Sequence, residues 1–321
     1  MYGNNVTVLV DSDSGRGLID ILVWIVTYFV LPVTFLFGTI GNVLTLRVLM
    51  SGSRYYRTST GIFMIALSLF DGLAVSVSVP VLFLRIAFTR AVLSPGFCSF
   101  YMALIFLCPS MSNMTLTFIS FDRLIVVFVP MMARTLCTVR KAALCLTALI
   151  FTQIIFNYQL ATNSVYIVSS NGVGDCDMLN YPIVRTVVRS LLRFWVPFLG
   201  ICICNVSIAV KLGIYAQMRT KLSESTSNSK TAKTNISLTI MLCVVSFVFI
   251  VLNIPLLVGN CIRQISGLTL SVGFVNAISW ITRACNAVNS AMNFYLYCLS
   301  SREFRQDFLS KFGRRKPTGA R

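Results

Sequence analysis

The sequence predicts an all-α membrane protein, a bundle of seven transmembrane helices followed by a short amphipathic helix on the cytoplasmic side. The first observation is composition: 56% of the 321 residues are hydrophobic and 12% are charged, about half the charged fraction of a typical soluble domain. The second is that apolar runs of about 20 residues, long enough to cross a bilayer, recur along the chain. The third is that basic residues fall mainly in alternate connections between these runs, which predicts an extracellular N-terminus and a cytoplasmic C-terminus.

The chain is predicted to have three parts, and the first two are a polar extracellular N-terminus at 1–19 and a transmembrane domain at 20–300. We expect no cleavable signal peptide, because no charged segment precedes a short apolar core. Asn5 begins a glycosylation sequon, whereas the similar Asn113-Met114-Thr115 lies in a predicted span and is expected to be inaccessible. The predicted spans are about 20–47, 58–84, 98–129, 141–161, 187–213, 236–261 and 270–298.

The third part is the cytoplasmic segment at 301–321. Its sequence "SSREFRQDFLSKF" places Phe304, Phe308 and Phe312 on one helical face beside Arg305 and Lys311. That pattern is typical of a short helix lying in the membrane interface, followed here by a basic tail.

The net charge of +17 does not indicate nucleic-acid binding, because the basic residues lie on the predicted cytoplasmic side, where they face anionic lipids and protein partners. The chain has no histidine and no nucleophile–base constellation, so we predict no enzyme. A small transporter or channel is the alternative class. Such proteins often carry internal repeats and paired broken helices, and no repeat is visible in this sequence.

Polar residues at mid-span depth are the first candidate site. Asp71 is an acid in the middle of the second span, where a carboxylate needs a cation, a partner or a proton. Further polar residues at this depth are Asn42, Ser112, Asn289, Ser290 and Asn293. Three interpretations stay open on composition alone: a sodium-sized oxygen site, a water-filled hydrogen-bond network, or separate hydrogen bonds that hold helices together.

Two charged features complete the candidates. Asp122 and Arg123 are adjacent at the inner end of the third span and can hold each other until a partner competes, although a snorkelling pair would look the same. In "RTVVRSLLRFWVP", Arg185, Arg189 and Arg193 recur every four residues and so line one helical face. An arginine at mid-depth costs roughly 2.5–3.5 kcal/mol even on the lenient insertion scale.

In their order and spacing, several motifs resemble those of a rhodopsin-like (class A) G-protein-coupled receptor. Cys98 lies 25 residues before Arg123, as the family's third-span cysteine does, and Pro197 matches the fifth-span proline. Phe304 fits the amphipathic helix that follows the last span. The remaining matches are "GNVL" at 41–44, "LSLFDG" at 67–72, "FDRLIVVFVP" at 121–130, "FIVLNIP" at 249–255 and "NSAMNFYLY" at 289–297.

The resemblance implies roles for individual residues. Asp71, Ser112, Asn289, Ser290 and Asn293 fall where the family lines a sodium pocket, and no other cofactor is expected. Asp122, Arg123, Met131, Asn293 and Tyr297 are expected to serve activation and docking of a heterotrimeric G protein, with arrestin as a second candidate partner and lipids around the bundle. Cys98 and Cys176, both predicted on the oxidising side, are expected to form a disulfide.

An outer ligand cavity is also implied by the resemblance. Its expected residues are Arg85, Ile105, Arg189, Arg193, Asn253, Arg263 and Arg283. Arginine forks grip carboxylate or phosphate groups bidentately, so we expect an anionic ligand, either a peptide or a small molecule. Ile105 replaces the aspartate of amine receptors and Ala287 the retinal lysine of opsins, which excludes a photopigment and argues against amines. An invertebrate-type peptide receptor or a chemosensory receptor is the expected subtype.

The sequence departs from the family pattern at five positions, which are Leu124, Asn205, Asn235, Asn253 and Phe294. Asn235 stands where an acid often holds the arginine of the third span, so we expect the resting state to be less firmly latched and to show basal activity. The usual tryptophan of the sixth span and proline of the seventh are replaced by Asn253 and Phe294.

Overall fold

The computed structural model of the protein describes residues 13–51, 55–87, 95–162, 164–168, 174–178, 188, 191–221, 230–264 and 272–312. Several residues of the sequence analysis fall elsewhere: Asn5, Arg185 and Arg189 lie outside the described residues. Four more belong to described helices or strands, but their side chains are outside the described part; they are Arg85, Cys176, Asn235 and Arg263.

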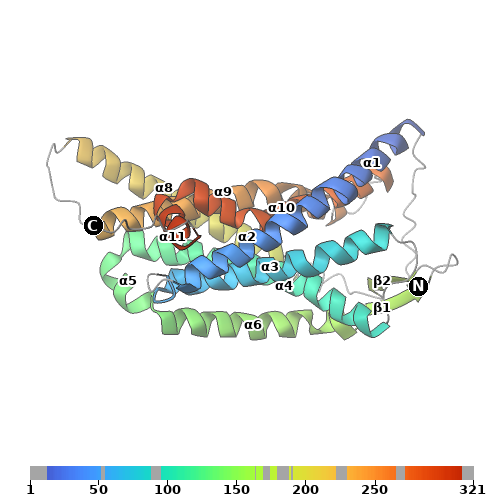
Figure 1. Cartoon of the computed structure of the whole chain (residues 1–321), viewed down its shortest axis with the longest axis horizontal. Helices are drawn as coiled ribbons and strands as arrows, with labels where there is room; N and C mark the ends of the chain where they lie inside the picture. The colour runs from blue at the N-terminus through green and yellow to red at the C-terminus, as the bar shows by residue number, and fades with distance from the viewer. Residues whose placement is uncertain are drawn as a thin grey trace, which may run out of the picture.

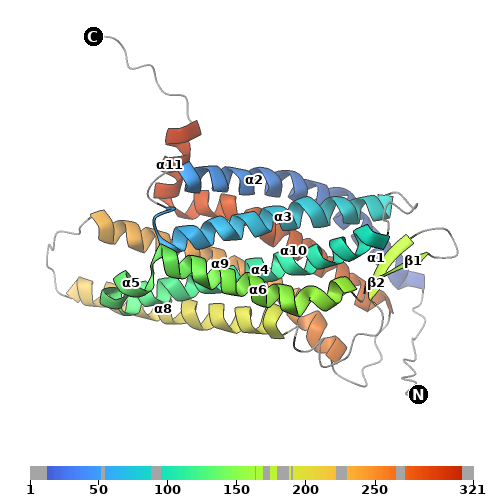
Figure 2. The same cartoon turned by 90° about the horizontal axis from the view of Figure 1, so that it is seen from below.

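Seven long helices run along one axis and form a bundle, as the sequence predicted (Figures 1 and 2). The first consists of α1 (Asp13–Ile25), the π-helical segment η1 (Val26–Val30) and α2 (Leu31–Ser51). The others are α3 (Ser59–Ala87), α4 (Pro95–Phe128), α6 (Val139–Thr162), η2 (Leu191–Trp195) with α8 (Val196–Lys221), α9 (Lys230–Gln264) and α10 (Val272–Ser300). Among the described residues, the short helices are α5 (Pro130–Leu136), between α4 and α6, and α11 (Arg302–Phe312), which runs across the direction of the long helices at the edge of the bundle in Figure 2.

A two-stranded hairpin at one end of the bundle was not predicted, because this region was assigned to a loop. Strand β1 (Ser164–Val168) pairs antiparallel with β2 (Gly174–Met178), and Tyr166 lies opposite Cys176. The residues "SVYIV" of β1 are mostly β-branched or aromatic, which favours an extended strand. Both strands contact α4. We call this the hairpin end of the bundle and the opposite end, which bears α5 and α11, the α11 end (Figure 1).

Most helices extend beyond the predicted spans. The largest differences are at α8, which continues to Lys221 rather than residue 213, and at α1, which begins at Asp13 rather than residue 20. The length of an apolar run reflects the thickness of the bilayer. The helix itself is longer, because its backbone hydrogen bonds continue into the polar residues on either side of that run. Six described helices are long and apolar enough to cross a membrane. The seventh, α10, has the length but carries several polar side chains turned toward its neighbours.

The outer faces of the helices carry large apolar side chains, while polar side chains lie inside. On α6, Leu144, Phe151 and Ile155 are exposed, the last to 71%, which a soluble protein would rarely tolerate over such an area. Inside the α11 half, one cluster joins α3, α4 and α9 to Tyr297 and Phe304. The surface of the bundle is therefore built to face lipid.

Helices α2, α3 and α10 approach one another closely at Gly38. A Cβ atom added there would lie 2.9 Å from the Cβ of Ala291 and 3.1 Å from Cγ1 of Val75. These distances are shorter than van der Waals contact, so only a residue without a side chain fits. Small residues at such crossings let membrane helices pack backbone to backbone.

Gly38→Ala is expected to lower the thermal unfolding temperature of the purified protein, because the new methyl group overlaps Ala291 and Val75. Overpacking of this kind costs about 1–3 kcal/mol. Gly213→Ala in α8 is the matched control, since a Cβ there meets nothing within 4 Å. Alanine also favours helix over glycine by about 1 kcal/mol, so this variant should keep or raise the unfolding temperature. Identical behaviour of the two variants would contradict the close approach.

Candidate functional site

Asp71 lies at the centre of a polar cluster that joins three helices. Its side chain is 0% exposed. Ser112 of α4 donates its hydroxyl to Oδ1 at 2.7 Å, and the Nδ2 of Asn293 of α10 donates to Oδ2 at 2.6 Å. The hydroxyl of Ser290 also donates to this carboxylate. Four of the five residues predicted for the cation site therefore meet in space.

The first helix is tied to the same cluster through the backbone of α10. The Nδ2 of Asn42 donates to the Ser290 carbonyl at 2.9 Å. Asn289, the fifth predicted residue, is half-buried and is not among the side chains that hydrogen-bond Asp71. The cluster thus consists of one carboxylate surrounded by neutral hydroxyl and amide groups.

The donor set fits a single monovalent cation. A carboxylate offers about four lone-pair positions, and three of these are used by Ser112, Ser290 and Asn293. The hydroxyl oxygens of Ser112 and Ser290 are hard ligands of the kind that sodium accepts. Among the described residues, no group of three or more His, Cys, Asp or Glu side chains is placed to hold a metal ion. With one negative charge, the cluster suits a singly charged ion better than a divalent one.

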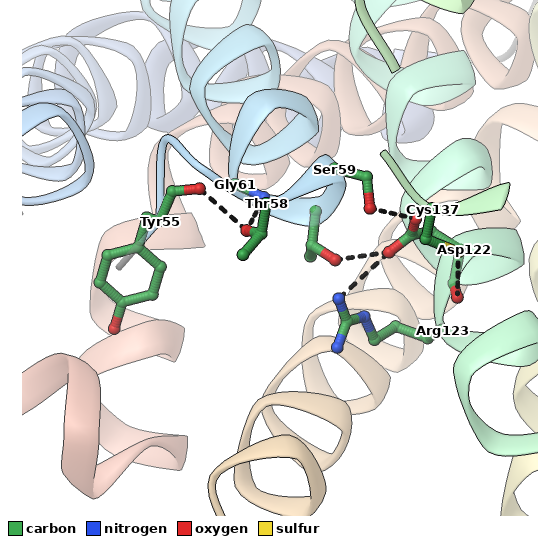
Figure 3. Close-up of polar contacts among 8 residues, drawn as sticks. Tyr55, Thr58, Ser59, Gly61, Asp122, Arg123 and Cys137 are labelled. Carbon is green, nitrogen blue, oxygen red and sulfur yellow. Dashed lines mark hydrogen bonds and ion pairs between the residues drawn. The ribbon is translucent and has the colours of Figure 1, made fainter. Parts of the chain in front are cut away.

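At the α11 end, Asp122 and Arg123 are both buried and hold each other, as one reading of the sequence proposed (Figure 3). The Nη2 of Arg123 lies 3.1 Å from Oδ2 of Asp122. Two hydroxyls from the start of α3 also donate to Asp122: that of Ser59 to Oδ1 at 2.6 Å and that of Thr60 to Oδ2. The carboxylate is thereby fixed to α3, and it fixes Arg123 in turn.

The start of α3 is shaped to present these hydroxyls. The hydroxyl of Thr58 accepts a hydrogen bond from the Gly61 amide at 3.1 Å, as an N-cap does, and donates to the Tyr55 carbonyl at 2.8 Å (Figure 3). A Cβ at Gly61 would lie 1.9 Å from that carbonyl, so glycine is required for the turn to fold back. The turn and the cap set the position of Ser59 and Thr60.

The second connection at this end also contacts Asp122. Cys137, between α5 and α6, donates its thiol to the Asp122 carbonyl at 3.9 Å. Burial, with a further effect of the nearby Asp122 carboxylate, raises the pKa of Cys137 to about 12, so the thiol stays protonated at neutral pH. It acts as a weak donor and not as a reactive thiolate.

Two other predicted residues at the α11 end differ in exposure. Tyr297 is fully buried, with its ring 5.4 Å from that of Phe304. Met131, at the start of α5, is 78% exposed and faces outward at the end of the bundle. An exposed apolar side chain at this position is available to a protein partner.

Arg193 lies within the π-helical segment η2, in the hairpin half of the bundle. Its guanidinium carbon is 5.1 Å from the ring centroid of Phe106 on α4 and 5.0 Å from that of Phe194. Stacking against aromatic faces orients the planar guanidinium and stabilises its charge. The side chain is half-buried, so it is held between helices and does not extend freely to headgroups.

Arg283 of α10 is exposed, and its guanidinium carbon lies 5.2 Å from the ring centroid of Trp280. Trp280 itself packs against a cluster of α3 and first-helix side chains. Arg283 precedes Ser290 by seven residues, which places the two on the same face of the helix. Arg283 therefore lies on the face of α10 that carries Ser290, further toward the hairpin end, with its side chain exposed.

Both arginines lie on the hairpin side of the Asp71 cluster. Arg283 is about 10 Å of helical rise from Ser290, and Phe106, which stacks on Arg193, is six residues or about 9 Å from Ser112. Ser112 and Ser290 both bond Asp71. Arg283 and the ring that stacks on Arg193 therefore both lie about two helical turns from the Asp71 cluster on the hairpin side, and we call this level the arginine layer.

Other residues predicted for the ligand region, and the predicted disulfide near it, have contacts that do not involve Arg193 or Arg283. Ile105 packs with Cys98 and Met102 at the hairpin end of α4. Asn253 is buried on α9 and donates its Nδ2 to the Phe249 carbonyl at 2.8 Å. Cys98 is disulfide-bonded, and its pairing with Cys176 stays a prediction, because no described side chain identifies the partner.

Sequence reasoning missed the residues that support the charged groups. Ser59 and Thr60 follow the N-cap signal of α3, which was readable as a helix start but did not indicate a contact with Asp122, 62 residues away from Thr60. The aromatic rings beside Arg193 and Arg283 gave no signal either, since aromatic residues are common throughout the chain.

A bundle of seven membrane-spanning helices with a buried acid at mid-depth and an acid–arginine pair at one end defines a seven-helix receptor. The sequence model of the family described as "7 transmembrane receptor (rhodopsin family)" matches residues 41–297, well over half of the chain. The chain therefore belongs to this family, the class A G-protein-coupled receptors. A comparison with curated proteins found no match. Members of the family are multi-pass plasma-membrane receptors that signal through G proteins and are not enzymes, and a transporter is not favoured.

The double variant Ser59→Ala/Thr60→Val should raise basal nucleotide exchange on a reconstituted G protein several-fold. Each lost hydrogen bond to the charged Asp122 is worth roughly 1.5–3 kcal/mol, and without them Arg123 is less firmly held. The matched control is Thr152→Val, which removes an exposed hydroxyl that bonds only its own helix at Ala148. Basal exchange at the wild-type level in a folded double variant would show that these hydroxyls do not restrain the receptor.

Proposed function

We propose that this receptor binds an extracellular ligand bearing a carboxylate, phosphate or sulfate group in the hairpin half of the bundle. Binding would then activate a heterotrimeric G protein that docks at the α11 end. The observation that carries this proposal is the layer formed by Arg193 and Arg283. Two arginines from different helices lie on the hairpin side of the Asp71 cluster, and each stacks on an aromatic ring.

The chemistry of this layer favours an anion. An arginine held inside a membrane bundle, as Arg193 is, is costly. A second arginine on the same side of the Asp71 cluster favours a shared purpose over two separate snorkelling side chains. Guanidinium groups present their donors in a fixed fork that matches the two oxygens of a carboxylate or phosphate. A small organic acid, an acidic peptide or the free C-terminus of a peptide meets this requirement, and the subtype stays a prediction.

Orientation in the membrane is part of the same proposal. The hairpin end and the N-terminus face outward, and the basic α11 end faces the cytoplasm, as the positive-inside distribution favours. Exposed residues at the α11 end, Met131 among them, are available to a G protein and to arrestin. Anionic lipid headgroups would surround Arg302, Arg305 and Lys311 of α11, which are all exposed.

Activation is a shift between two states of the bundle. In the state described here, Arg123 is bound to Asp122. A ligand that holds η2 and α10 in a different arrangement favours a second state, in which Arg123 leaves Asp122 and contacts the G protein. A sodium ion at Asp71 would stabilise the first state, because it balances the carboxylate charge and adds oxygen contacts across α3, α4 and α10.

Asp71→Asn is expected to abolish the stabilisation of the receptor by sodium. The test compares unfolding temperatures in sodium chloride and in choline chloride at equal ionic strength, which holds screening constant. Asp20→Asn is the control, because Asp20 is an exposed acid of α1 whose loss should leave the sodium effect unchanged. An equal sodium effect in Asp71→Asn and the wild type would rule out this ion site.

Arg193→Ala and Arg283→Ala should each weaken agonist binding by about 10-fold or more. A charge-assisted hydrogen bond lost from a buried pair is worth roughly 1.5–3 kcal/mol. The agonist is to be found by screening carboxylates, phosphates, sulfates and acidic peptides with a nucleotide-exchange readout. Lysine at either position should restore only part of the affinity, because an ammonium group lacks the bidentate fork.

The matched control is Arg57→Ala. Arg57 also stacks on an aromatic ring, that of Tyr56 at 5.7 Å, but it lies next to the α11 end of α3. Its loss should leave agonist binding unchanged. An agonist that is a cation without an acidic group, or wild-type binding in both alanine variants, would refute the anion site.

A further inference from the structure

The carbonyl of Arg193 has lost its usual helical donor. In an α-helix, the amide four residues later would bond it, but that residue is Pro197, which has no N–H. Asn113 of α4 supplies a replacement, because its Nδ2 donates to the Arg193 carbonyl at 3.1 Å. A freed backbone carbonyl inside a membrane bundle needs such a partner, since no bulk water reaches it.

Asn113 is well placed to hold this segment. Its side chain is 5% exposed, and it lies seven residues after Phe106, hence on the same face of α4. Phe106 stacks on the guanidinium of Arg193 while Asn113 holds its carbonyl. One face of α4 therefore grips both the side chain and the main chain of the same arginine.

The direction of the side chain agrees with this arrangement. Helical side chains lean toward the N-terminus of their helix, and here that direction leads from Arg193 toward the hairpin end. Phe106 is displaced from Asn113 in the same direction, by about 10 Å of helical rise. Because Asn113 holds the backbone carbonyl of Arg193, it also sets how far along α4 the guanidinium of Arg193 reaches.

We propose that Asn113 is a positioning residue for the ligand site, which fixes η2 to α4 and so sets the place of the Arg193 guanidinium. This inference rests on the proposed role of Arg193 in binding an anion. The chemistry requires a donor at residue 113, which leucine and ionised aspartate cannot supply. Since Ser112 bonds Asp71 and Asn113 bonds Arg193, neighbouring residues of one helix contact the arginine layer and the buried acid.

The test compares Asn113→Leu with the wild-type receptor, full length and in lipid nanodiscs. Hydrogen exchange of the amides in residues 191–200 and modification of Arg193 by phenylglyoxal are both followed by mass spectrometry. We expect exchange in this segment to be roughly 10-fold faster, which is the effect of losing one buried hydrogen bond on local opening. Modification of Arg193 should be several-fold faster, because its guanidinium leaves the ring of Phe106.

Asn157→Leu is the matched control. Asn157 is also buried, and its Nδ2 donates to a backbone carbonyl, that of Gln153 at 2.7 Å, but within α6. The Asn157→Leu variant should keep the wild-type rates of hydrogen exchange in residues 191–200 and of Arg193 modification. Should Asn113→Leu fail to fold, Asn113→Ser is measured in its place, because serine is too short to reach the carbonyl. Wild-type exchange and wild-type labelling in a folded variant at residue 113 would overturn the proposal.

Hydrogen exchange and phenylglyoxal labelling are both measured without an agonist. The positioning role of Asn113 and the anion site can therefore be refuted independently of each other. Faster exchange at 191–200 in the Asn113 variant, together with wild-type agonist binding by both Arg193→Ala and Arg283→Ala, would remove the anion site and leave the positioning contact in place. Unchanged exchange together with a large loss of binding in Arg193→Ala would remove the role of Asn113 and leave the anion site. If the anion site and the positioning role of Asn113 are both supported, Asn113→Leu should weaken agonist binding about as much as Arg193→Lys.

Discussion

A carboxylate in the middle of a membrane bundle must find its hydrogen-bond donors within the protein, and Asp71 finds them on two other helices. Ser112 and Asn293 bring α4 and α10 to α3, and Asn42 adds the first helix through the backbone of α10. The close approach at Gly38 joins α2, α3 and α10 as well. Apolar packing alone would leave the rotation of each helix weakly specified, because lipid tails are as apolar as the helix surfaces. Directional bonds to one buried acid fix the rotation.

Helix α4 connects the three candidate sites. Cys98 is disulfide-bonded at its hairpin end, Phe106 stacks on Arg193, Ser112 bonds Asp71, and Asp122 holds Arg123 near its other end. These contacts all lie on one continuous helix, so a small rotation or translation of α4 changes several at once. A ligand at one end and a G protein at the other would then bias the same two-state element, which is the physical content of coupling in this family.

The departures from the family pattern are accommodated by local packing. Phe294, which replaces a proline, leaves α10 helical through Ser300 and packs its ring against those of Phe304 and Phe308 at 6.1 and 5.3 Å. Asn253, which replaces a tryptophan, turns its amide back to its own helix at Phe249. Neither replacement interrupts its helix, since α9 and α10 run unbroken through these positions. Their effect is therefore to be sought in the balance between resting and active states, which depends on small differences in free energy.

The sequence by itself determined the number of helices, their order and the depth of their charged residues. Bilayer thickness sets the length of an apolar run, and the cost of a buried charge makes Asp71 and Arg193 stand out from it. Only the tertiary structure decided which side chains meet: that Asp122 is bound by Thr60 across 62 residues, and that Asn113 takes the carbonyl freed by Pro197. Helical periodicity gives the face on which a residue lies but not the neighbour that it meets. Contacts between helices depend on their rotation, tilt and register, which are set by packing that a linear pattern does not contain.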